Sequence, residues 1–117
     1  MSGDVNFRDE AVEFNDFDRE FGEFLLRFSR CSSPELMAAG MLIARELRNG
    51  SVKLDLERYA NTTLLLSDDV CAALPSAADW SRILTAPEMN RIASPAGEDD
   101  GKSLLVFINE HTLMLRR

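Results

Sequence analysis

Phenylalanine recurs at three- and four-residue steps through the first quarter of the chain, the spacing that lines one face of an α-helix. The apolar positions of this stripe are Phe14, Phe17, Phe21, Phe24, Leu25 and Phe28. The charged positions between them would form the opposite face: Asp16, Asp18, Arg19, Glu23 and Arg27. We therefore predict an amphipathic helix over residues 14–28 whose phenylalanine row packs into the core.

The next apolar segment, LMAAGMLIAREL, carries the start and stop signals of a second helix. Ser32 and Glu35 have the spacing of a capping box, and Pro34 suits a first turn because its missing N–H would be unpaired there anyway. Asn49-Gly50 supplies a left-handed stop. Alanines and a glycine in this segment would let another backbone approach closely. We expect it to be the central helix, packed against the phenylalanine face of the first.

After Gly50 the period changes to that of a β-strand. Apolar residues at 52, 54 and 56 alternate with Lys53 and Asp55, which predicts a short, half-buried strand. At the end of the chain, the segments SLLVFIN (103–109) and TLMLRR (112–117) flank a turn at residues 109–111. This pattern predicts a closing β-hairpin.

The apolar residues within 57–66 follow neither the helical nor the strand spacing, so no helix or strand is predicted there. Ser67, followed by Asp68 and Asp69, favours a helix start, because serine caps helices and acids suit the positive end of the helix dipole. Pro75 would close this short helix. We interpret the three polar residues as cap chemistry and not as an acid/base or metal site.

Ser76 and Asp79 repeat the capping spacing and predict a last helix, which Pro87 interrupts. Trp80 begins its apolar stripe; tryptophan is common at binding hot spots, but here we favour a core position. Residues 94–102, rich in glycine, proline and acids, form a surface loop. Together these elements predict a mainly helical α+β domain over residues 14–117, with three or four helices and a small antiparallel sheet. Residues 1–13 would be an acidic N-terminal arm.

Composition and net charge limit which classes of function the chain can have. The chain has 117 residues, 45% hydrophobic and 28% charged, which is typical of one soluble globular domain. It carries a net charge of −7, which disfavours nonspecific DNA binding, although a local basic face of late arginines is possible. The acidic N-terminus lacks signal-peptide features, so we expect a cytoplasmic protein without a membrane segment. Cys31 and Cys71 have no metal-binding spacing, and we expect free, buried thiols.

The segment from Gly97 to Ser103, GEDDGKS, is one residue short of the phosphate-binding loop G-x-x-x-x-G-K-[ST]. Its three consecutive carboxylates would repel phosphate. Lys102 and Ser103 also lead into a β-like stretch instead of the helix N-terminus that such a site requires. We interpret the segment as a solvated acidic loop.

No catalytic or metal-binding group is predicted. His111 is the only histidine and falls in the hairpin turn, an exposed place with poor control of its protonation. We interpret it as a surface turn residue. The phenylalanine row could be imagined as a base-stacking platform, but such platforms lie in cationic grooves and this row is flanked by acids.

In order and spacing, these pieces resemble the N-terminal domain of RecD, the α subunit of exodeoxyribonuclease V. The segments that carry the resemblance are Phe21-x-x-Phe24-Leu25, Ser33-Pro34-Glu35-Leu36 with Ala38-Ala39, Gly50-Ser51-Val52-Lys53-Leu54-Asp55-Leu56, Trp80, Leu104-Leu105-Val106, and Leu113-Met114-Leu115-Arg116-Arg117. They span about residues 14–117. The family often has His where Ser51 stands and Cys where Lys53 stands, so no function is assigned to either position.

The resemblance implies a non-catalytic domain of a 5′-to-3′ DNA helicase subunit that acts in double-strand-break repair and recombination. ATP and Mg²⁺ would bind only to motor domains that are absent from this chain, which would itself hold no cofactor. The implied partners are RecC-like and RecB-like subunits, with the domain docking the motor onto RecC and DNA contacted through the whole complex. Candidate partner-contact residues are Val5, Phe7, Val12 and Trp80. Replacement of Phe7 with Ala should weaken assembly without loss of thermal stability.

Two alternatives stay open. The chain could be a strand-guiding module that uses its late arginines (Arg82, Arg91, Arg116 and Arg117) on DNA, in which case binding would weaken steeply with salt. It could instead be a free-standing acidic regulator unrelated to RecD. The parent could also be a stand-alone RecD-like helicase. The oligomeric state is not predicted.

Overall fold

A computed structural model describes residues 14–30, 32–67, 70–86, 89, 92–94 and 103–115. In these ranges the helices are α2 (Asp16–Ser29), α3 (Pro34–Arg48), α4 (Leu56–Tyr59) and α5 (Ala77–Leu84). The strands are β1 (Lys53–Asp55), β2 (Thr63–Ser67), β3 (Val70–Ala73), β4 (Ala93–Ser94), β5 (Leu105–Phe107) and β6 (Thr112–Leu115). The predicted mainly helical α+β fold is confirmed.

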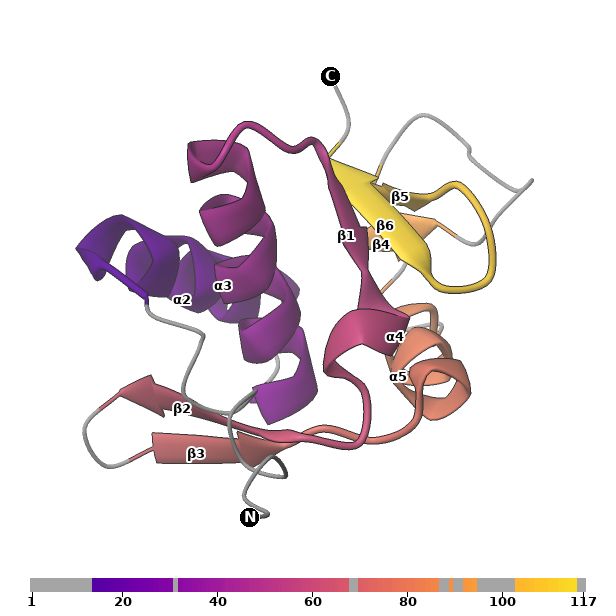
Figure 1. Cartoon of the computed structure of the whole chain (residues 1–117), viewed down its shortest axis with the longest axis horizontal. Helices are drawn as coiled ribbons and strands as arrows, with labels where there is room; N and C mark the ends of the chain where they lie inside the picture. Colours follow the sequence, from indigo (N-terminus) through magenta and orange to yellow (C-terminus); the bar gives the residue numbers. More distant parts are fainter. Residues whose placement is uncertain are drawn as a thin grey trace, which may run out of the picture.

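Helix α3 is the centre of the molecule. Figure 1 shows it between α2 and strand β1, and it also contacts α5 and the β2–β3 hairpin. The small residues of α3 are buried, from Ala38 to Ala44 without a break. This helix is therefore the predicted central helix, and its small side chains bring several neighbours close to its backbone.

Two glycines set the distance between α2 and α3. A Cβ atom placed on Gly40 would lie 2.7 Å from Leu25 Cδ1 and 3.1 Å from Gly22 Cα. A Cβ on Gly22 would lie 2.8 Å from Met41 Cγ and 3.0 Å from the backbone oxygen of Met37. Any side chain at either position would force these neighbours to shift, so glycine on both helices allows the present close crossing.

Asp18 is buried, although the sequence pattern placed it on the polar face of its helix. Its carboxylate accepts hydrogen bonds from Arg48 Nε at 3.2 Å and Nη2 at 2.6 Å, and from the backbone N–H of Asn15 at 3.1 Å. In return, the Asn15 side chain accepts from the Asp18 N–H, which completes a capping box. The paired carboxylate thus joins the start of α2 to the end of α3.

The start of α3 differs from the prediction by one residue. Its N-cap is Ser33, whose hydroxyl accepts from the Leu36 N–H at 3.1 Å, so the predicted cap at Ser32 is wrong. Adjacent serines give the same local signal, and Pro34 at the first helical position selects Ser33. The stop is as predicted, with Gly50 at a φ of 91° directly after the helix.

The four-stranded sheet has the order β1-β6-β5-β4. Strands β5 and β6 form the predicted hairpin, and β6 pairs antiparallel with β1, as expected for the strand after Gly50. The Asn109 side chain fixes the hairpin turn by accepting from the N–H groups of His111 and Thr112. Strand β4 pairs parallel with β5 and was not predicted.

The helix predicted between Ser67 and Pro75 is wrong. Strands β2 and β3 form a two-stranded hairpin there, with Leu64 and Leu66 buried and Leu65 58% exposed. This alternation suits a sheet, and short polar residues favour turns as well as helix caps. Cys71 pairs in register with Leu65; it is free but exposed, so the prediction of a buried thiol is wrong for this residue. Asp68, Asp69 and Cys31 lie outside the described residues.

Helix α5 begins at its predicted cap, since Ser76 accepts from the Asp79 N–H. Trp80 has no exposed surface and donates its indole N–H to the backbone oxygen of Glu35 at 3.0 Å. This bond fastens α5 to the first turn of α3. No helix in the described ranges is long and apolar enough to cross a membrane.

Candidate partner-binding surface

The phenylalanine row of α2 is only partly buried. Phe17 is 57% exposed and Phe24 is 41% exposed, whereas Phe14, Phe21 and Phe28 pack partly against the core. The prediction that the whole row belongs to the core is therefore wrong for Phe17 and Phe24. We call the outward row of Phe17, Phe21, Phe24 and Phe28 the phenylalanine ridge.

The physical reason lies in the close helix crossing. Gly22 and Leu25, together with Asp18, form the face of α2 that meets α3. At about 100° per residue, the phenylalanine ridge is centred roughly a quarter-turn away from that face. The ridge thus borders the core along one edge and meets solvent along the other.

Ring contacts hold the ridge together. The rings of Phe21 and Phe24 are stacked with centroids 6.2 Å apart, and those of Phe24 and Phe28 with centroids 5.7 Å apart. Offset ring stacking adds about 0.5–1.5 kcal/mol per pair beyond burial. The ridge is therefore an ordered surface, and aromatic residues with few rotatable bonds are favoured at binding hot spots.

The outer edge of the ridge is acidic. Glu20 lies three residues after Phe17 and four before Phe24, so it is a neighbour of both on the helix surface. Asp16, four residues before Glu20, is exposed on the same edge, and Arg27, three residues after Phe24, adds one basic side chain to it. A complementary partner would present apolar side chains flanked by basic ones.

Two polar contacts hold α2 in place. Arg19 Nε donates to the Leu66 backbone oxygen at 3.1 Å, which attaches the helix to β2. At the other contact, the Arg48 guanidinium donates two hydrogen bonds to the Asp18 carboxylate, and this contact raises the pKa of Arg48. The ridge is consequently carried by a helix fixed at several points.

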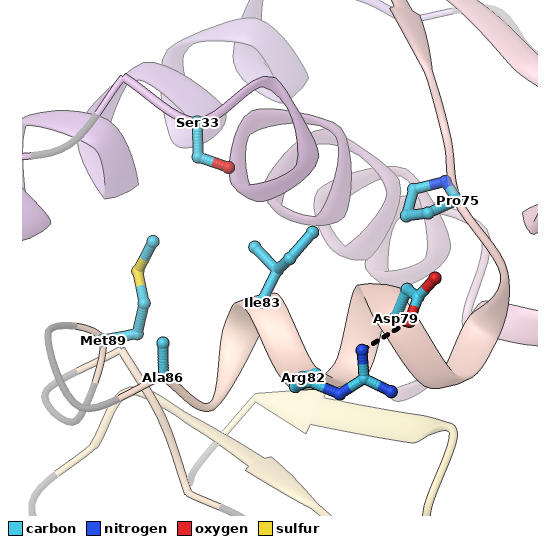
Figure 2. A pocket seen from close by; sticks show the side chains of 7 residues that line it. All are labelled: Ser33, Pro75, Asp79, Arg82, Ile83, Ala86 and Met89. Carbon is cyan, nitrogen blue, oxygen red and sulfur yellow. Dashed lines mark hydrogen bonds and ion pairs between the residues drawn. The ribbon is translucent and has the colours of Figure 1, made fainter.

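A second surface feature is a hollow of about 650 Å³ between α5 and the N-terminal end of α3. Figure 2 shows Ile83 pointing across it toward α3, with Met89 and Ala86 at one end and Pro75 at the other. Its charged groups, Asp79 and Arg82, already pair at 2.5 Å. An apolar wall with a self-paired rim suits an apolar side chain better than a polar substrate.

Of the four predicted contact residues, the structure describes only Trp80. Val5, Phe7 and Val12 lie outside the described residues. Trp80 is fully buried, as expected for a core residue, and offers no surface to a partner in this state.

Two other sequence motifs are placed by the structure. Ser103, which ends the phosphate-loop-like segment, is 1% exposed, and its hydroxyl donates to the Leu105 backbone oxygen at 2.8 Å. It also pairs with the hydroxyl of Ser94 at 2.6 Å, so it faces the protein interior. His111 lies in the hairpin turn as predicted and is partly exposed. Residues 95–102 lie outside the described ranges.

Sequence reasoning missed Phe17 and Phe24 as surface residues. The available signal was the offset between the apolar stripe and the glycine at position 22. A glycine in a helix indicates a close backbone approach, and that approach defines which face is inside.

One family model matches the chain. It describes the N-terminal domain of the RecBCD enzyme subunit RecD and covers residues 10–107. No curated protein and no solved structure gave a match. The match covers α2 to β5, including the whole phenylalanine ridge.

Proposed function

The chain belongs to the family of RecD N-terminal domains of the RecBCD enzyme, and from this premise we propose that it docks a 5′-to-3′ DNA helicase motor onto a RecC-like subunit. The domain itself would be non-catalytic. ATP and Mg²⁺ would be bound by motor domains outside this chain, and a RecB-like subunit would complete the assembly. Family membership contradicts the alternative of an acidic regulator unrelated to RecD.

The observation that carries this proposal is the exposure of Phe17 and Phe24 on an ordered helix. Two large apolar side chains exposed on one helix face form an apolar row with a polar border, which is typical of a protein interface. Full burial of a phenylalanine contributes about 1.5–3 kcal/mol. Because each ring is already about half buried, docking would gain roughly 1–1.5 kcal/mol from each.

The test is assembly with a double substitution, Phe17→Ala with Phe24→Ala. The protein carrying this domain is co-purified with its cognate RecC-like and RecB-like subunits, and its affinity for the RecC-like subunit is measured by biolayer interferometry. Affinity should fall by roughly tenfold for each ring. The melting temperature should fall moderately, because Phe24 loses its two ring contacts, but the domain should stay folded, because neither ring is a buried core residue. Phe17→Ala alone, which removes neither of these two ring contacts, should leave the melting temperature nearly unchanged.

The matched control is Glu23→Ala, an exposed position on the side of the same helix away from the rings. It should leave both affinity and stability unchanged. Unaltered affinity of the phenylalanine variant would contradict the proposal, and a large loss of melting temperature would show that the rings stabilise the core. Phe7→Ala, tested in parallel, examines the expectation that the N-terminal arm adds to the same contact.

A further inference from the structure

An imidazole lies between two carboxylates where the β5–β6 turn meets the junction of β1 and α4. His111 Nδ1 is 3.0 Å from Asp55 Oδ1, and His111 Nε2 is 3.8 Å from Glu57 Oε1. One ligand atom from each of the three side chains lies within 4.8 Å of the other two. These are three groups that bind divalent metal ions, brought together from distant parts of the sequence.

The backbone places all three with little freedom. Asp55 is the last residue of β1 and pairs in register with Thr112, the first residue of β6. The Leu56 N–H donates to the His111 backbone oxygen at 2.8 Å, so the histidine is held directly beside the start of α4. Asp55 also caps α4 by accepting from the Glu57 N–H at 3.0 Å. The cluster thus sits on a strand end, a helix cap and a fixed turn.

The local charge also suits a cation. Glu110 adds a third carboxylate next to His111 in the turn. Of the two nearby cations, Arg58 is turned over the ring of Tyr59, with its guanidinium carbon 5.6 Å from the ring centroid. Lys53 lies two residues before Asp55 on the same strand face, about 7 Å along the strand. The three side chains are 35–62% exposed, so an ion can reach them from water.

We propose that Asp55, Glu57 and His111 form a binding site for a divalent transition-metal ion of the Zn²⁺ class. Imidazole favours such ions, whereas Mg²⁺ and Ca²⁺ prefer oxygen ligands throughout. Tetrahedral Zn²⁺ with bonds of about 2.0–2.2 Å holds its ligand atoms about 3.4 Å apart. The three ligand atoms here lie within 4.8 Å of one another, so rotation of the exposed side chains must bring both carboxylates toward the same ring nitrogen of His111. Water takes the fourth position. The ion fastens the β5–β6 turn to the joint between β1 and α4.

This proposal does not depend on partner docking, and its test needs no partner. Metal-free protein without a histidine tag, carrying Cys31→Ser and Cys71→Ser to remove thiol ligands, is titrated with ZnCl₂ by calorimetry. CoCl₂ is titrated in parallel with visible absorption as the readout of inner-sphere ligands. One Zn²⁺ per chain is expected to bind, and MgCl₂ should not compete.

His111→Gln, Asp55→Asn and Glu57→Gln should each weaken Zn²⁺ binding by about tenfold or more. Asparagine keeps the helix cap at position 55, so that variant loses only the charge. Asp79→Asn, an exposed carboxylate on α5, is the matched control and should bind as the parent does. Zn²⁺ should also raise the melting temperature of the parent and not that of His111→Gln. Absence of saturable binding, equal binding of Mg²⁺, or binding that is indifferent to all three substitutions would overturn the proposal.

Discussion

Tyr59 is a buried polar residue that makes the stability of the fold depend on pH. Its hydroxyl donates to Glu46 Oε2 at 3.2 Å, and the side chain lies in the core cluster. Burial raises the pKa of this phenol above its usual value near 10. The charges of Arg58 and Arg45 oppose the rise and the charge of Glu46 adds to it, and the net direction is upward. The neutral phenol is therefore favoured in the folded state.

This shift predicts a loss of stability in alkali. Above pH 10 the unfolded chain releases the tyrosine proton while the folded chain keeps it, so the free energy of unfolding falls as pH rises. Below pH 10 the contribution is fully present. In urea unfolding at pH 8 and at pH 11, Tyr59→Phe should be less stable than the parent at pH 8, and the gap should close at pH 11.

The chain has one tyrosine, so absorbance of the phenolate reports Tyr59 alone. The two lysines, Lys53 and Lys102, are unchanged in the variant and serve as an internal control. Parallel stability curves of parent and variant across this range would contradict the assignment of the alkaline loss to Tyr59.

At the scale of elements, the crossing of α2 and α3 depends on the pair Gly22 and Gly40. Alanine is normally the better helix residue by about 1 kcal/mol. Here each added methyl group would meet atoms at 2.7–3.1 Å, including backbone atoms that cannot rotate away. We predict that Gly22→Ala and Gly40→Ala each lower the free energy of unfolding by about 1–3 kcal/mol.

Because a Cβ on Gly40 would meet Gly22 Cα, the two substitutions share one contact. In a double-mutant cycle their effects should not add, and the coupling should be about 0.5 kcal/mol or more. Urea unfolding checks this, with Glu23→Ala on the exposed side of α2 as the control, expected within about 0.5 kcal/mol of the parent. Alanine variants as stable as the parent would show that the helices can separate without cost.

Local signals explain which elements the sequence predicted. Helices α3 and α5 were predictable because the residues that start and stop a helix act over a few neighbouring positions. Ser76, the N-cap of α5, is an example. The β2–β3 hairpin was not predictable, because a serine followed by two acidic residues suits a turn as well as a helix N-cap. Only the packing of Leu64 and Leu66 against α3 decides between them. Likewise β4 is two residues long, and its parallel pairing with β5 is determined by tertiary contacts alone.

The same reasoning applies to the candidate surface. The phenylalanine spacing correctly predicted a helix, but periodicity does not say which part of an apolar stripe faces inward. Gly22 decides that, because α3 approaches there. The cluster around His111 required the β1–β6 register, which joins residues far apart in sequence.

At the scale of the whole molecule, charge separates protein docking from DNA guiding. The chain carries a net charge of −7, and the exposed ridge on α2 is bordered by acids. Phosphate contacts need cations, and base stacking alone would have to overcome this repulsion.

We therefore predict that the domain does not bind single-stranded DNA. Fluorescence anisotropy with a labelled oligonucleotide should show no saturable change up to about 10 µM protein at about 150 mM salt. Saturable binding that weakens steeply with salt would instead support the strand-guiding module that uses the late arginines.

The strand order also determines when the strands of the four-stranded sheet can pair during synthesis of the chain. Strand β6 lies between β1 and β5, yet it is the last of the three to leave the ribosome. At about 5–20 residues per second, β1 waits several seconds for its partner. During that interval helices α2 and α3 can pair, since their contacts are local, while the edge of β1 is open to wrong partners. Lys53 and Asp55 place a charge at each end of that three-residue strand, and charged side chains are a known protection of open sheet edges against aggregation.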